Sequence, residues 1–182
     1  MNIIETPIKD LLIIEPKVWK DDRGYFFESY NKAAFEKIGI NVDFVQDNQS
    51  FSHKNALRGL HCQANPHAQG KLVRVIRGKV LDIAVDIRKN SATYGEHFSI
   101  ELSGENKKMF YVPPGFLHGF VTLEDETIFN YKCTGLFNKD AELGVIWNDA
   151  ELGIDWGINP ADAIVSAKDA VLPAFSTINS PF

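Results

Sequence analysis

The fold is indicated most clearly by Lys71-Leu-Val-Arg-Val-Ile-Arg-Gly-Lys-Val-Leu-Asp-Ile-Ala-Val-Asp-Ile87. Lys71–Ile76 and Val80–Ile87 are short segments rich in Val and Ile, which favour β-strands. They flank Arg77-Gly78-Lys79, and this arrangement predicts a β-hairpin.

Short alternating segments recur along the rest of the chain. Within one of them, Gln46, Asn48 and Ser50 fall on one face of the expected strand. One or two helices are expected, and the best candidate is Asn31–Ile38, with Asn31 as its N-cap. Many short strands and few helices predict a mainly-β fold, a sandwich or barrel of the jelly-roll type. Besides the two segments around Gly78, the expected strands are Tyr25–Tyr30, Asp43–Phe51 (which contains Gln46, Asn48 and Ser50), Phe98–Leu102, Met109–Val112 and Thr127–Cys133.

Composition narrows the class of protein. The 182 residues carry 19 basic and 24 acidic side chains, and no repeat or linker divides them, so a single domain over residues 1–182 is expected. The net charge of −5 disfavours nucleic-acid binding. Two cysteines, Cys62 and Cys133, are too few for a disulfide scaffold. The start of the chain does not resemble a secretory signal, and the longest aliphatic run, Leu11–Ile14, is too short to span a membrane, so a cytoplasmic protein is expected.

Two segments have the framework of the metal-binding motifs of cupin jelly rolls, but with altered ligands. Pro113-Pro-Gly-Phe-Leu-His118 resembles the second motif. In the first motif, His61-Cys62-Gln63 stands where two histidines are usual, and Lys71 stands at the position of the glutamate. An ammonium group repels a divalent cation and an amide is a poor transition-metal ligand, so no metal is expected.

An ordered set of seven segments identifies a closer resemblance. The chain resembles the dTDP-4-dehydrorhamnose 3,5-epimerase family, which has a cupin-type jelly roll with a few short helices and uses no metal or organic cofactor. The resemblance implies a dTDP-linked 4-keto-6-deoxyhexose as substrate, inversion at carbons 3 and 5 on the route to rhamnose, and a homodimer whose N-terminal strands cross between subunits. The segments are Asp22–Glu28, Gln46–Ser50, Leu57–Gln63, Gly70–Lys71, Val112–Phe120, Tyr131–Thr134 and Ser166–Asp169.

The resemblance implies four catalytic residues. His61 matches the base, and its ordinary pKa near neutrality suits proton abstraction next to a ketone. Asp169 matches the carboxylate that orients the imidazole. Lys71 would stabilise negative charge on the C4 oxygen. Tyr131 matches the acid that returns a proton from the opposite face of the sugar.

The resemblance also implies a set of binding residues. Arg58 and Lys71 would contact the diphosphate, because guanidinium groups bind phosphate oxygens in a bidentate manner. Phe137 would stack on thymine through its ring face. The remaining contacts would be Arg23, Phe26 and Glu28 for the nucleoside, partly from the neighbouring subunit; Gln46, Asp47 and Asn48 in the cleft; His118 at the sugar or phosphate; and Glu142 and Lys168 at the outer pocket.

Structural interpretations compete with several of these roles. Without the resemblance, Tyr131 would be interpreted as a core-packing residue, Asp169 as the cap of a turn and Lys71 as a solvent-exposed lysine on a strand edge. Arg58 and His61 have opposite parity on a regular strand, so a bulge at Gly59 is needed to turn both into one pocket.

The product also stays open. Gly135 and Lys139 stand where the family usually has an acidic residue and a proline, so the sequence does not decide which nucleobase the loop prefers. The alternatives are a 3-epimerase or keto-isomerase acting on a related dTDP-4-keto sugar, a metal-dependent cupin oxygenase, and a non-catalytic sugar-nucleotide-binding protein. Cys62 follows His61 but is expected to face away from it as a small hydrophobic residue, and not to act as a nucleophile.

Overall fold

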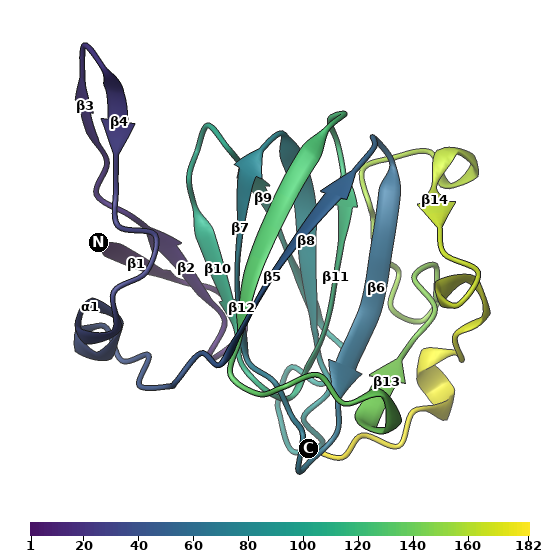
Figure 1. Ribbon diagram of the computed structural model, residues 1–182. Coiled ribbons are helices and arrows are strands. Elements are labelled where there is room, and N and C mark those ends of the chain that lie inside the picture. Colours follow the sequence, from purple (N-terminus) through teal and green to yellow (C-terminus); the bar gives the residue numbers. More distant parts are fainter.

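A computed structural model describes all 182 residues, and its body is a sandwich of two antiparallel sheets (Figure 1). The first sheet has the order β1 (Asn2–Glu5), β2 (Leu12–Glu15), β10 (Met109–Val112), β7 (Lys71–Arg77), β12 (Thr127–Cys133), β5 (Gln46–Ser52). The second has the order β13 (Glu142–Gly144), β6 (Ala56–Gln63), β11 (Phe116–Thr122), β8 (Lys79–Asp86), β9 (His97–Ser103). The mainly-β jelly-roll prediction is therefore confirmed.

The remaining elements lie outside the two main sheets. β3 (Trp19–Asp21) and β4 (Gly24–Phe26) form a separate hairpin that projects away from the sandwich (Figure 1). β14 (Ile164–Val165) adds to β6 in parallel. None of the helices has the length and apolar character needed to cross a bilayer. The helices are α1 (Lys32–Lys37) and the 3₁₀ turns Lys139–Ala141, Pro160–Asp162, Asp169–Val171 and Phe175–Thr177.

The predicted hairpin at Gly78 is wrong, although both of its strands exist. β7 pairs with β10 and β12, whereas β8 pairs with β9 and β11, so Gly78 carries the chain from one sheet to the other. Gly78 has a φ of +79°, and a Cβ there would lie 2.9 Å from the Cα of Thr127. A glycine is needed at this crossing because other residues rarely adopt this backbone conformation and a side chain has no room.

Three apolar layers hold the sandwich together. The interior between the sheets is filled by side chains such as Val73 and Phe129 from one sheet and Val80 and Phe120 from the other. The outer face of the second sheet is covered by the C-terminal segment, and the outer face of the first by α1 and its flanking loop.

Helix α1 is formed as the sequence predicts. The side chain of Asn31 accepts a hydrogen bond of 3.2 Å from the backbone N–H of Ala34, which is the expected N-cap geometry. Phe35 is buried from this helix and anchors it to the sheet, where burial of an aromatic side chain stabilises by about 2–3 kcal/mol.

Candidate active site

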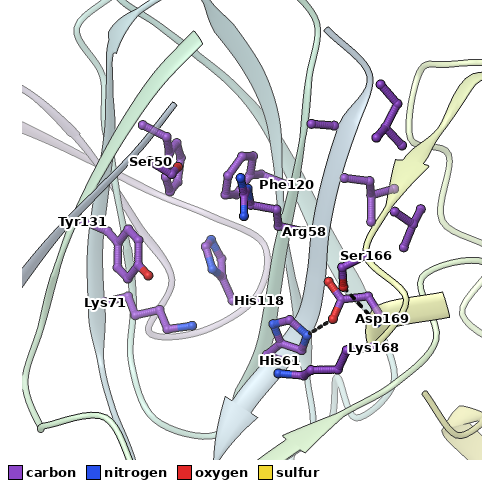
Figure 2. Close-up of a pocket in the computed structure, with 15 residues that line it drawn as sticks. Ser50, Arg58, His61, Lys71, His118, Phe120, Tyr131, Ser166, Lys168 and Asp169 are labelled. Atoms are coloured by element: carbon purple, nitrogen blue, oxygen red, sulfur yellow. Dashed lines mark hydrogen bonds and ion pairs between the residues drawn. The ribbon is translucent and has the colours of Figure 1, made fainter. Parts of the chain in front are cut away.

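A cavity of about 500 Å³ opens inside the sandwich, where polar side chains interrupt the apolar interior. Its two walls belong to different sheets: Lys71 and Tyr131 come from β7 and β12, and His61 comes from β6. Figure 2 shows Lys71 and Tyr131 on one side and the His61–Asp169 pair on the other. The lining residues are Ser50, Ala56, Leu57, Arg58, His61, Lys71, His118, Phe120, Phe129, Tyr131, Ile164, Val165, Ser166, Lys168 and Asp169.

The bulge expected at Gly59 is present and brings Arg58 and His61 into the same cavity. Arg58 pairs with Phe120 and His61 pairs with His118, so β6 has two residues, Gly59 and Leu60, between these pairs where β11 has one. Gly59 has a φ of +133°, and a Cβ at this position would lie 2.6 Å from the Cα of Gly119. The extra residue reverses the alternation, and both side chains therefore face the sandwich interior.

His61 is held by a carboxylate at the wall of the cavity. Its Nε2 lies 2.7 Å from Oδ1 of Asp169, whose side chain is only 6% exposed. The second carboxylate oxygen accepts the backbone N–H of Gly59 at 3.4 Å. Burial lowers the pKa of His61, and the negative charge of Asp169 partly opposes this effect. The ring is therefore neutral at pH 7, with its proton on Nε2 and Nδ1 free to accept another proton.

Lys71 lies inside the cavity without an ion-pair partner. Burial lowers its pKa, and the nearby Cys133, Cys62, Asp82 and Glu142 partly restore it. An anionic ligand in the cavity would favour the protonated form of this lysine and would neutralise its charge.

Tyr131 faces the cavity from the opposite sheet to His61. Burial raises the pKa of its phenol, and the nearby Arg58 lowers it. The phenol is therefore protonated at neutral pH and can donate a proton.

A second imidazole–carboxylate pair lies beside the first, and sequence reasoning missed its acidic member. Nε2 of His118 is 2.8 Å from Oδ1 of Asp82, which is fully buried on β8. Burial raises the pKa of Asp82, while His118 lowers it. Asp82 is the one charged residue in the apolar run Val80–Val85, and a charge in a buried strand requires a partner, which was the available signal.

A smaller cavity of about 120 Å³ adjoins the first and shares His61, Lys71 and Tyr131 with it. Four further predicted binding residues lie along it or at its edge. Glu142 forms an ion pair of 2.6 Å with Lys168, which lines the larger cavity. The four residues are Gln46, Asn48, Phe137 and Glu142.

Four predicted binding residues are not brought to the cavity within one chain. Asp47 lies on the opposite face of β5, because side chains alternate along a strand, and there it pairs with Lys132 at 2.6 Å. Arg23 and Phe26 belong to the projecting β3–β4 hairpin, where Phe26 is 67% exposed. Glu28 accepts a hydrogen bond of 3.0 Å from Asn31 beside α1.

The altered cupin ligands have other contacts. Gln63 is buried and forms hydrogen bonds with the backbone of neighbouring loops. Burial raises the pKa of Cys62 to about 11, so this thiol is protonated and unreactive at pH 7. No three His, Cys, Asp or Glu residues are grouped so that they could hold a metal ion.

The arrangement therefore combines a neutral base, a lysine without an ion-pair partner and a protonated phenol around one cavity. A base on one wall and an acid on the other suit the removal of a proton next to a carbonyl and its return to the opposite face. The cationic groups suit an anionic ligand.

Comparison with known proteins identifies relatives along nearly the whole chain. The family model described as dTDP-4-dehydrorhamnose 3,5-epimerase matches residues 5–177. The dTDP-4-dehydrorhamnose 3,5-epimerase of Salmonella typhimurium is 52% identical, over 95% of this chain and 94% of that protein.

Solved structures agree with this result. A crystal structure of the dTDP-4-dehydrorhamnose 3,5-epimerase from Elizabethkingia anophelis has a TM-score of 0.93 at 52% identity and covers 97% of each chain. The dTDP-6-deoxy-D-glucose-3,5-epimerase from Legionella pneumophila, in complex with dTDP-4-keto-L-rhamnose, has a TM-score of 0.94 at 45% identity and covers 98% of this chain and 94% of that one.

Proposed function

Because this chain belongs to the dTDP-4-dehydrorhamnose 3,5-epimerase family, we propose that it converts dTDP-4-dehydro-6-deoxy-D-glucose to dTDP-4-dehydro-L-rhamnose, with His61 and Tyr131 transferring the protons. The family makes the chain an isomerase of dTDP-rhamnose synthesis. The observation that carries the assignment of roles is the Asp169-bound imidazole of His61 facing the same cavity as Tyr131, from the opposite sheet.

His61 begins the reaction as the base. Its Nδ1 takes the proton from the carbon next to the ketone, and the electron pair of the C–H bond moves to the C4 oxygen as an enolate forms. Asp169 holds the Nε2 proton at 2.7 Å and stabilises the imidazolium ion that results.

Lys71 stabilises the enolate oxygen. A positive charge about 4 Å from this oxygen contributes about 4 kcal/mol at an effective dielectric constant of about 20. Since Lys71 has no carboxylate partner of its own, its charge is available to the developing oxyanion.

Tyr131 completes the inversion. Its hydroxyl group donates a proton to the other face of the same carbon, and the electron pair returns from the oxygen to re-form the ketone. Proton exchange with water resets the imidazolium and the phenolate. The same two groups then act at the second carbon.

The nucleotide lies toward the outer part of the cleft in this proposal. Arg58 and His118 bind the diphosphate and sugar, while Lys168 and Glu142 border the outer pocket. The exposed ring of Phe137 stacks on the thymine.

The homodimer and the cytoplasmic location belong to this proposal as well. The projecting hairpin exposes Trp19, Tyr25 and Phe26 at 47%, 56% and 67%, which is unusual for aromatic side chains of an isolated chain. Insertion of the hairpin at the cleft of a second subunit would cover these rings and bring Arg23 to the nucleotide.

Incubation with dTDP-4-dehydro-6-deoxy-D-glucose in deuterated water tests the function. Deuterium at both carbons 3 and 5 of an L-configured product is expected. Deuterium at carbon 3 alone would indicate a 3-epimerase, and incorporation at neither carbon would indicate a non-catalytic binding protein. Activity that disappears on chelation and returns with iron or manganese would support a metal-dependent enzyme instead.

A further inference from the structure

The loop that carries Phe137 has an unusual source of order. Phe137 follows β12, and both Leu136 and Phe137 are strongly exposed, at 67% and 58%. The backbone of residues 135–137 makes no hydrogen bond to other backbone groups. Neither core packing nor a strand ladder therefore fixes the direction of the aromatic ring.

Three glutamine side chains supply the missing hydrogen bonds. Gln69 donates to the carbonyl of Gly135 at 2.6 Å. Gln46 accepts the backbone N–H of Phe137 at 2.8 Å. Gln63 donates to the carbonyl of Leu136 at 3.3 Å and accepts the N–H of the residue after Phe137, Asn138, at 2.8 Å.

The contacts cover four consecutive residues and come from three separate parts of the fold. Gln46 begins β5, Gln63 ends β6, and Gln69 precedes β7. Gln63 is only 5% exposed, and its amide nitrogen also donates to the carbonyl of His67 at 2.6 Å. Both N–H groups of the Gln63 amide donate and its carbonyl oxygen accepts, which fixes the orientation of the amide.

We propose that Gln46, Gln63 and Gln69 form a glutamine clamp that holds Phe137 in place as the stacking surface for the nucleobase of the substrate. The inference rests on the proposed function and extends it to positioning residues that do not touch the base. An exposed ring on a mobile loop would have to be ordered during binding, and this entropy cost would weaken affinity. The clamp orders the loop in advance.

The clamp also accounts for the altered loop sequence. Gly135 and Lys139 replace the residues expected there and leave a flexible glycine two residues before Phe137. Side-chain hydrogen bonds to the backbone compensate for this flexibility. They also explain why an amide stands at position 63, where cupins place a metal ligand.

A double-mutant cycle tests whether Gln63 acts through Phe137. KM and kcat for dTDP-4-dehydro-6-deoxy-D-glucose are measured for the wild type, Gln63→Leu, Phe137→Ala and the double variant. We expect Gln63→Leu to raise KM about tenfold and to lower kcat by less than about threefold. In the Phe137→Ala background the same change should alter KM by less than about twofold.

Equal effects of Gln63→Leu in both backgrounds would overturn the proposal, as would a loss confined to kcat. Gln69→Leu is measured in the same cycle, because Gln69 is only half-buried and its replacement disturbs the interior less. Gln49→Leu is the matched control, since Gln49 is exposed on β5 and its side chain makes no hydrogen bond.

Calorimetric titration with dTDP separates this inference from the proposed function. Coupling between Gln63 and Phe137 in the Kd for dTDP would support the clamp even in a protein that does not epimerise the sugar. Epimerisation with strictly additive effects of the two substitutions on Kd would overturn the clamp and leave the proposed function standing.

Discussion

Replacement of Asp169 by asparagine removes a charge from the base and leaves the shape of the side chain nearly unchanged. Oδ1 of Asp169 accepts the Nε2 proton of His61 at 2.7 Å, and Oδ2 accepts the N–H of Gly59 at 3.4 Å. An asparagine satisfies only one of these donors. If its carbonyl faces Gly59, its amide donates to Nε2 and moves the ring proton to Nδ1, which can no longer act as a base.

The expected decrease in kcat follows from the distance between His61 and Asp169. Two unit charges 2.7 Å apart interact by about 6 kcal/mol at an effective dielectric constant of about 20. If about half of the imidazolium charge has developed in the transition state, its loss costs about 3 kcal/mol, or about 150-fold in kcat. Together with the wrong tautomer, a decrease of about 10²–10⁴-fold is expected.

The assay measures kcat from deuterium incorporation at saturating dTDP-4-dehydro-6-deoxy-D-glucose. Asp125→Asn provides a matched control, because Asp125 contacts His53 at 3.2 Å in a third His–Asp pair, and the side chains of His53 and Asp125 are 74% and 70% exposed. The control should retain full activity. An Asp169→Asn protein with more than about a tenth of the wild-type kcat would show that the carboxylate is not needed to orient and charge-balance His61.

Three further predictions concern the rest of the molecule. Asp82→Asn should lower kcat about 10- to 100-fold, because it weakens a charge-assisted hydrogen bond to the cavity imidazole, and unchanged steady-state kinetics would contradict this role. If the hairpin completes the neighbouring site, inactive Arg23→Ala and His61→Ala proteins should regain activity when they are unfolded and refolded together, because one site of the mixed dimer then has both residues intact. No recovery of activity in the mixed dimer would argue against a shared site. Asp86 is fully buried, and although burial raises its pKa, hydrogen bonds from an arginine and two hydroxyl groups lower it to about 2. Since the unfolded carboxyl group titrates near 3.8, this stabilisation, about 2.5 kcal/mol, is present above pH 4 and is lost as the pH falls through 2. The melting temperature of Asp86→Asn should therefore be lowered at pH 7 and converge with that of the wild type near pH 2.

The sequence predicts strands well because alternation is a local property. Met109–Val112 and Thr127–Cys133 coincide with β10 and β12, and the N-cap of α1 is at Asn31 as expected. Strand partners are not local, and this explains the error at Gly78. The same apolar pattern suits a hairpin within one sheet and a crossing between two, and only the packing of the whole sandwich decides between them.

The candidate site shows the same division. The family resemblance implies His61, Lys71, Tyr131 and Asp169, and these four residues line one cavity. The sequence alone does not predict the role of Asp82. Asp82 and His118 are far apart in sequence, and they meet only because β8 pairs with β11.

The positions of the predicted outer binding residues also depend on features that are not local in the sequence. Asp47 was assigned with its neighbours, but the alternation of β5 turns it to the other face of the sheet. In the proposed function Arg23 contributes through a second subunit, which the sequence of one chain does not specify.

The Tyr131→Phe protein tests whether a base and an acid act from opposite walls of one cavity. Deuterium exchange into the substrate and formation of the L-configured product are followed by NMR in the same sample of deuterated water. We expect exchange with retained configuration to continue, because His61 still removes a proton and returns a deuteron to the same face, while inversion falls about 10²–10⁴-fold. Equal loss of exchange and inversion would contradict the division of roles between the two walls.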